Sequence, residues 1–298
     1  MLVILLRAAM FKPENINIGE AASDADNINI PDLLNENKDK IVKDLSDMLK
    51  CKTVSSRDGF DITEFFRFQK LLEERFPLIH KKAKLVKIGK TGLLYKIDGK
   101  NENSGEKNIC VCMSHYDVVP AAQEQWEKPA FEGIVEDDCI WGRGAIDTKS
   151  TLCALTEALE MLLNSGYKPQ GDLYLSFSGE EEIDGKSCPE IVDYLEKEGV
   201  KPTFVLDEGG AIVNHVFPGV TKDCAIVGTG EKGSVNFDFE VKSCGGHSST
   251  PPAHTAAGVI SKAVCDIEAK PFKRQLTKPV LDMFNTLGRD SKFGCEII

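Results

Sequence analysis

The sequence predicts an α/β protein in which helices cover the faces of a sheet, followed by a smaller α+β unit. Between residues 84 and 206, strand-like and helix-like segments alternate along the chain, which is the order that an α/β sheet requires. Within this stretch, residues 108–113 form an apolar run bounded by polar residues, which is typical of a buried central strand. After about residue 225 the pattern changes, because apolar and polar residues alternate over residues 234–241. This alternation indicates a half-exposed antiparallel strand, so we expect a second unit of mixed helix and strand.

The elements follow from local patterns. Residues 12–35 are polar and rich in Asn and Asp, so we expect residues 1–35 to be a loosely ordered lead-in. Helices are expected where apolar residues recur at spacings of three and four, and strands where short apolar runs end at turn residues. The expected helices cover residues 41–49, 62–76, 151–163, 189–198 and 256–268. The expected strands are a hairpin within residues 83–97 and single strands at 109–113, 173–177, 203–206 and 234–241, with a polar turn at 101–107.

Composition excludes several classes of protein. The 298 residues are 42% hydrophobic and 28% charged, as in a globular protein that buries a core. The net charge of −11 argues against nucleic acid or an anionic membrane surface as a partner. The apolar residues 2–6 are too few for a membrane span and lack the features of a signal peptide. Ten scattered cysteines without a C-x-x-C pair indicate free thiols in a reducing compartment, so we expect a cytoplasmic protein without a thiolate zinc site.

Four motifs place His, Asp or Glu after an expected strand or before an expected helix. The carboxyl ends of strands are where α/β proteins hold their ligands, so these side chains are candidates for one shared site. In chain order, the motifs are SHYD at residues 114–117, WGRGAIDTK at 141–149, GEEE at 179–182 and LDEGG at 206–210.

Each motif alone also has an ordinary structural explanation. Asp147 precedes a helix and would commonly be its N-cap, and the acids at 180–182 would commonly be a solvated patch. Acids that converge after several buried strands, however, repel one another unless a cation neutralises them. In an extended chain, His115 and Asp117 project to the same side, so Asp117 can orient the ring of a metal-bound His115.

The four motifs together predict an oxygen-rich metal site with one imidazole. Zinc accepts this mixture of ligands, and Co²⁺ or Mn²⁺ are alternatives. Two metal ions that share Asp147 would lower the pKa of a water molecule between them and polarise a substrate carbonyl. A nearby carboxylate that is not a ligand can then accept the proton of that water and transfer it to the leaving nitrogen.

The motifs SHYDVVP, GRGAIDTKS, GEEEIDG and LDEGG, in this order, resemble the M20 metallopeptidase family. Residues 76–80 and 93–95 most resemble its carboxypeptidase S and PM20D1-type branch, which is related to aminoacylase-1 and succinyl-diaminopimelate desuccinylase. The resemblance implies a zinc-exopeptidase-like α/β/α sheet domain with a smaller inserted α+β domain that serves as a lid and in dimerisation. Residues 36–224 would be the first part of the catalytic domain, and residues 225–298 an incomplete lid domain.

The resemblance also implies a role for each acid of the site. His115 would bind one metal ion, Asp147 would bridge two zinc ions, and Asp117 would be the hydrogen-bond partner of His115. Glu181 would be the general base and Glu182 a ligand of the second ion. The remaining ligand would be Glu208, with the adjacent Asp207 as the alternative.

The second domain carries a fifth motif of the family, whereas a motif that follows this domain in the family is not found. GGHSS at residues 245–249 matches the family's loop whose histidine, here His247, would stabilise the substrate oxyanion, often across a dimer interface. In the family, a segment after the lid domain brings a last histidine ligand for the second ion, and we expect that this sequence lacks it because of a C-terminal truncation.

Two functions follow from the resemblance. The first is hydrolysis of an amide or peptide bond next to a free carboxylate, in an N-acyl amino acid or short peptide, with a homodimer formed through the lid domain. The alternative is a truncated homologue without catalytic activity that acts as a binding or dimerising protein.

Overall fold

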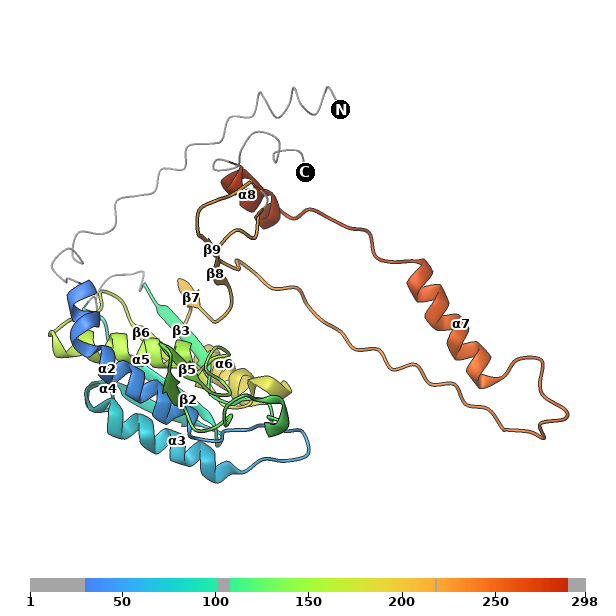
Figure 1. Cartoon of the computed structure of the whole chain (residues 1–298), viewed down its shortest axis with the longest axis horizontal. Coiled ribbons are helices and arrows are strands. Elements are labelled where there is room, and N and C mark those ends of the chain that lie inside the picture. Colours follow the sequence, from blue (N-terminus) through green and yellow to red (C-terminus); the bar gives the residue numbers. More distant parts are fainter. Residues whose placement is uncertain (1–29, 101–107, 218, 289–298) are drawn as a thin grey trace, which may run out of the picture. The chain divides into compact units, whose positions relative to one another are not determined.

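The computed structural model of the chain describes residues 30–100, 108–217 and 219–288 (Figure 1). The described residues form two compact units, of which the first ends at Glu208 and the second begins at Gly209. The expected domain boundary after residue 224 and the assignment of the two domains as catalytic and lid stay predictions. The expected turn at 101–107 and most of the expected lead-in lie outside the described residues.

The first unit contains a five-stranded sheet with the strand order β1-β2-β6-β3-β7. β1 and β2 form the predicted hairpin, and β2 pairs antiparallel with β6. β3 pairs in parallel with both β6 and β7, so the carboxyl ends of these three strands lie at one edge of the sheet. The strands are β1 Lys84–Ile88, β2 Gly92–Ile97, β3 Cys110–His115, β6 Leu173–Ser178 and β7 Phe204–Leu206.

Helices cover both faces of this sheet, which confirms the predicted α/β fold. On one face, Leu93, Tyr95 and Phe177 of the sheet pack into a buried apolar cluster with α2, α3, α4 and α5. On the other face, Leu94 and Tyr174 pack against α6. Successive side chains of a strand point to opposite faces, so the continuous apolar runs of β2 and β6 supply both clusters. The helices are α2 Ile30–Leu49, α3 Ile62–Arg75, α4 Pro77–Lys82, α5 Lys149–Asn164 and α6 Ser187–Lys197, with short 3₁₀ turns η2 Gln123–Gln125 and η3 Glu181–Ile183.

Several elements of the first unit differ from the sequence prediction, among them the short helix α4, which was not expected. α2 begins at Ile30 rather than near residue 41. The sequence did not indicate its first half, which is mostly exposed and has only Ile30, Leu33 and Leu34 as apolar residues. Pro31 and Asp32 in its first turn suit a helix start. The hairpin of β4 Ile134–Glu136 and β5 Cys139–Trp141 was not expected from the sequence; it turns at Asp137 and Asp138, both with positive φ.

In the second unit, α7 Ala256–Ala269 confirms the helix predicted at 256–268, and α8 Lys278–Leu287 and the hairpin of β8 Ala211–Val213 with β9 Cys224–Ile226 are additional. The strand predicted at 234–241 is wrong: these residues form no strand, and the side chains of Phe237 and Phe239 are more than 60% exposed. Alternating apolar and polar residues determine which way the side chains of a strand would point, but a strand also needs a neighbouring strand to pair with. None of the strands among the described residues pairs with this segment.

Two further observations concern the described residues as a whole. None of their helices combines the length and the apolar character needed to cross a membrane. All nine cysteines among them are free thiols.

Candidate metal centre

Five predicted site residues meet at the carboxyl edge of the parallel strands of the first unit. His115 is the last residue of β3, Glu181 and Glu182 follow β6 on the turn η3, and Glu208 follows β7. Asp147 reaches the same place from the segment before α5. The parallel pairing of β3 with β6 and β7 therefore brings together residues that lie up to 93 positions apart in sequence, from His115 to Glu208.

His115 is the buried centre of this cluster. Its side chain is 2% exposed, and its Nδ1 lies 3.0 Å from the backbone oxygen of Asp117. Because a carbonyl oxygen can only accept a hydrogen bond, Nδ1 carries a proton, so a cation would bind at Nε2 in place of the second ring proton. Burial opposes protonation of the ring, but hydrogen bonds and negative charge from Asp117 and Glu208 outweigh it and raise the pKa of His115 to about 11.

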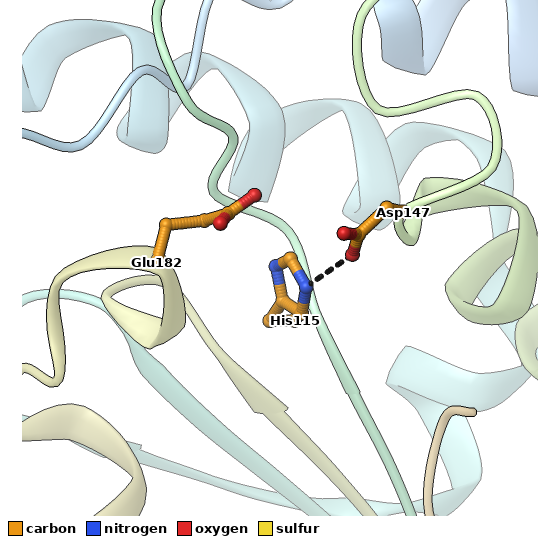
Figure 2. Close-up of side chains that lie close together, drawn as sticks. All are labelled: His115, Asp147 and Glu182. Carbon is orange, nitrogen blue, oxygen red and sulfur yellow. Dashed lines mark hydrogen bonds and ion pairs between the residues drawn. The ribbon is translucent and has the colours of Figure 1, made fainter. Parts of the chain in front are cut away.

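Carboxylate oxygens surround Nε2 of His115. The Oδ1 atom of Asp147 lies 2.9 Å away, an Oε2 atom of Glu208 3.4 Å and an Oε2 atom of Glu181 3.7 Å. Figure 2 shows Asp147 and Glu182 on either side of the His115 ring. Among the described residues, two overlapping sets bring their ligand atoms within 4.8 Å of one another: His115 with Asp147 and Glu182, and His115 with Glu181 and Glu208.

Asp147 is not the N-cap of α5. The N-cap is Thr148, and the carboxylate of Asp147 points instead to His115 (Figure 2). The preceding Gly144 permits this path, since its φ is +85° and an added Cβ would lie 2.6 Å from a Val118 methyl group. The glycine in the motif is therefore required by the backbone conformation and by the close approach of Val118.

Asp117 connects the elements that carry the cluster through hydrogen bonds of its carboxylate. Its fully buried carboxylate accepts hydrogen bonds from the backbone N–H groups of Glu181 and Glu182, at 3.0 and 3.1 Å, and from the Ser55 hydroxyl at 2.6 Å. Its Oδ1 also lies 3.4 Å from Nδ1 of His115. One carboxylate thus ties the end of β3 to the turn η3.

Two acids of the cluster, Glu181 and Glu182, lie in surroundings that disfavour their charged form. Burial raises the pKa of both Glu181 and Glu182, and neighbouring carboxylates add to this increase. The hydrogen bond to His115, by contrast, lowers the pKa of Glu208. A single imidazole faced by several carboxylates, of which Glu182 and Glu208 are partly buried and Asp147 and Glu181 exposed, is a donor set that suits a divalent cation such as zinc. The residues present therefore fit the predicted metal.

The structure distinguishes Glu208 from its neighbour. Asp207 is exposed, and its carboxylate accepts the backbone N–H of Glu208, whereas the carboxylate of Glu208 turns toward His115. Glu181 and Glu182 both lie within a metal-sized group, so the geometry does not separate the predicted base from the predicted ligand.

Two further residues show where the sequence prediction and the structure differ or cannot be compared. Ser55 supports Asp117, but no motif in the sequence indicated it; an isolated bridge between Val54 and Val118 brings its segment to the end of β3. His247 belongs to the second unit, where it is exposed and its Nδ1 accepts the backbone N–H of Ser249 at 3.3 Å. Its predicted role at the substrate stays a prediction.

Comparison with known proteins identifies the family of the chain. Residues 111–285, more than half of the chain, match the profile of peptidase family M20/M25/M40. The chain belongs to this family. The motifs that the M20 family match covers include His115, Asp147 and both glutamates of η3.

Named M20 relatives agree with the predicted branch. The chain is 34% identical to the N-fatty-acyl-amino acid synthase/hydrolase PM20D1 of Xenopus tropicalis, over 90% of this chain and 53% of that protein. It is 38% identical to the probable carboxypeptidase S-like 2 of Dictyostelium discoideum, over 80% of this chain and 47% of that protein. The chain spans about half the length of the curated relatives it matches. The predicted resemblance to the carboxypeptidase S and PM20D1-type branch is thereby confirmed.

Among solved structures, the chain is similar to the M20 family metallo-carboxypeptidase Sso-CP2 from Sulfolobus solfataricus. The TM-score is 0.46 and the identity 29%, over 58% of this chain and 38% of that chain.

Proposed function

We propose that this chain carries the metal site of an M20-type hydrolase, which cleaves an amide or peptide bond next to a free carboxylate. The observation that carries the proposal is the convergence of Asp147, Glu208 and Glu181 on Nε2 of the buried His115. The family of the chain supports it, because the convergent residues are those of the M20-like motifs.

In this proposal, His115, Asp147 and Glu208 hold one divalent metal ion, and Asp147 and Glu182 contribute to a second. Zinc is the expected metal, with Co²⁺ or Mn²⁺ as alternatives. When bound, such ions supply Lewis acidity, which lowers the pKa of water and polarises a substrate carbonyl. Asp117 keeps the proton on Nδ1 of His115 and thereby directs the lone pair of Nε2 to the metal.

Glu181 is the proposed general base. Burial already raises the pKa of its carboxyl group, which makes it a better proton acceptor than an ordinary surface glutamate. Its backbone N–H donates a hydrogen bond to Asp117, and this bond fixes the backbone from which its carboxylate reaches His115. Glu181 would take a proton from water as the water attacks the substrate carbonyl, and would deliver it to the leaving nitrogen.

His247 is the proposed donor to the substrate oxyanion. Its Nδ1 accepts a hydrogen bond from the backbone of Ser249, so the neutral ring carries its proton on Nε2. That proton is then free to be donated to a developing negative charge. We propose the surrounding second unit as a lid that also forms a homodimer, which analytical ultracentrifugation of the chain with and without Zn²⁺ would test.

The substrate class is supported by the names of the relatives. An N-acyl amino acid and the substrate of a carboxypeptidase both carry a free carboxylate next to the bond that is cleaved. The relatives are named as a fatty-acyl amino acid synthase/hydrolase and as a carboxypeptidase S-like protein.

Metal binding is the first test of the proposal. Isothermal titration of the 298-residue chain with Zn²⁺ would be compared for the wild type, His115→Gln and the control His254→Gln, which changes an exposed histidine. His115→Gln is expected to weaken binding by more than about 100-fold, because even outer hydrogen-bond partners of metal ligands contribute about 10–100-fold. Equal Zn²⁺ affinity of the wild type and His115→Gln would refute the proposed site.

Hydrolysis of N-acyl amino acids and dipeptides by the Zn²⁺-loaded chain is the second test. Glu181→Gln is expected to lower kcat by about 10²–10⁴-fold, as for loss of a general base, while Zn²⁺ affinity changes little. The control Glu196→Gln, on the exposed side of α6, should leave kcat unchanged. If Glu181→Gln hydrolysed as fast as the wild type, Glu181 would not be the base.

A further inference from the structure

The motif GEEE contains three adjacent glutamates, and the proposed chemistry uses only the last two. Among the described residues, Glu180 belongs to neither group that could hold a metal ion. Its carboxylate is instead held by two other parts of the fold. Oε1 accepts a hydrogen bond from the Thr91 hydroxyl at 2.8 Å, and Oε2 accepts the backbone N–H of Lys186 at 3.0 Å.

Thr91 is a firm anchor for this contact. It lies in the turn between β1 and β2 and is 1% exposed. Its carbonyl oxygen accepts a hydrogen bond from the hydroxyl of Tyr116 at 2.6 Å, and Tyr116 directly follows His115. The contact from Thr91 to Glu180 therefore connects the turn η3 to the same strand end that carries His115.

The loop that contains η3 closes around the side chain of Glu180. The backbone oxygen of Glu180 accepts the N–H of Gly185 at 2.8 Å, and that of Glu181 accepts the N–H of Asp184 at 3.0 Å. An added Cβ on Gly185 would lie 2.3 Å from Cβ of Glu180, so only glycine allows the chain to return so closely. Together with the bond from Lys186, these contacts make Glu180 the point at which both ends of the loop meet.

From this arrangement we propose that Glu180 is a positioning residue of the metal site. Asp117 accepts the backbone N–H groups of Glu181 and Glu182, and Glu180 holds the same loop through Thr91 and Lys186. The three adjacent acids thus divide into one that fixes the loop and two that face His115. This inference rests on the proposed function, because it assumes that Glu181 and Glu182 act at a bound metal.

Loss of the Glu180 side-chain contacts leaves η3 held by Asp117, by the backbone bonds of its own loop and by the exposed ion pair of Asp184 with Arg57. The carboxylates of Glu181 and Glu182 then occupy a wider range of positions, and a bound ion must restrict them again at the expense of affinity. Hydrogen-bond partners of this kind change metal affinity by about 10–100-fold, so we expect Glu180→Ala to raise the Kd for Zn²⁺ by about 10-fold.

If Glu180 acted only through its negative charge, the variants of Glu180 and Thr91 would differ in Zn²⁺ affinity in another way. Thr91→Val removes the hydrogen bond but keeps the charge, whereas Glu180→Gln removes the charge but keeps one acceptor oxygen. Positioning predicts that Thr91→Val weakens Zn²⁺ binding, that Glu180→Gln is milder than Glu180→Ala, and that the double variant Thr91→Val/Glu180→Ala is no weaker than Glu180→Ala. A charge effect predicts that Thr91→Val is neutral and that both Glu180 variants are equal.

The test combines Zn²⁺ titration with amide hydrogen exchange on the metal-free, full 298-residue chain, with Glu196→Gln as the control. We expect the amides of residues 181–186 to exchange faster in Glu180→Ala and in Thr91→Val than in the wild type, while those of α5 keep their protection. Unchanged exchange in this loop, or the pattern expected of a charge effect, would overturn the inference.

The exchange measurement also separates this inference from the proposed function. If the wild-type chain bound no Zn²⁺, the proposed function would fail, and hydrogen exchange alone would decide whether Glu180 holds the loop. If Zn²⁺ bound through His115 while the Glu180 and Thr91 variants matched the wild type in both measurements, the metal site would stand and the positioning role would fail.

Discussion

Replacing Asp117 with Asn tests whether the buried carboxylate next to the proposed metal site stabilises the fold even without metal. Asp117→Asn keeps the shape of the side chain but exchanges one acceptor oxygen for an NH₂ donor. The native carboxylate is fully buried and accepts hydrogen bonds from Ser55, Glu181 and Glu182. An amide cannot accept all three of them in the same places.

The expected loss of stability follows from counting these bonds. If the NH₂ group replaces Oδ1, it faces the backbone N–H of Glu181; if it replaces Oδ2, it faces that of Glu182, while the Ser55 hydroxyl can rotate and accept. Either way one backbone N–H loses its acceptor, at about 1–3 kcal/mol, and the remaining bonds lose their charge assistance, at about 1 kcal/mol. We therefore expect the free energy of unfolding to fall by about 2–4 kcal/mol.

Urea unfolding followed by circular dichroism, with EDTA present, would measure this change without any contribution from bound metal. Asp58→Asn is the matched control, because Asp58 is exposed, and it should change the free energy by less than about 0.5 kcal/mol. Removing a buried charge also removes its desolvation cost, which acts in the opposite direction. A stability of Asp117→Asn equal to or above that of the wild type would mean that desolvation outweighs the three hydrogen bonds, and would refute the reasoning.

Two further predictions concern the helices behind the site. Burial raises the pKa of Glu157 to about 7, and the adjacent Asp44 adds to this although Lys40 donates to both carboxylates. Because the pKa of Glu157 is higher in the folded than in the unfolded chain, its ionisation destabilises the fold as the pH rises. The free energy of unfolding of Glu157→Gln, measured by urea titration, should therefore rise relative to that of the wild type by on the order of 1–3 kcal/mol between pH 5 and pH 8. A difference that stays constant over this range would contradict the prediction. Phe68 is fully buried and stacks on Tyr116 at 4.8 Å, so Phe68→Ala should lower the free energy of unfolding by about 3–5 kcal/mol in the same assay; a loss under about 1 kcal/mol would show that the ring is not part of the core.

The sequence prediction was most accurate where apolar side chains recur at regular spacing, both in buried segments and in the exposed helix α7. The hairpin of β1 and β2, the strand β6 and the helix α3 were predicted within one residue or two, because their apolar side chains face the core at regular spacing. The first half of α2 was missed because its only apolar residues are Ile30, Leu33 and Leu34. The segment 234–241 has a regular pattern but no partner strand among the described residues, so its pattern alone did not produce a strand.

The sequence by itself determined the family and the strand ends at which the acids of the site lie. Motif order and spacing along the chain are sufficient for both, since parallel strands bring their carboxyl ends to one edge. The sequence could not determine which direction each acidic side chain takes within the site. That Asp147 faces His115 instead of capping α5, and that Glu208 rather than Asp207 turns inward, depends on backbone paths at the ends of elements.

Only the tertiary structure could reveal the supports of these acids. Ser55 lies 62 residues from Asp117 and Thr91 lies 89 residues from Glu180, and no local pattern marks either pair. Three adjacent glutamates have the same chemistry in the sequence, and only the folded chain separates Glu180, whose carboxylate bonds to Thr91 and Lys186, from the two that face His115. The physical reason is that a side chain's direction is set by the backbone beneath it, while its partner is set by chain segments that packing brings from far away.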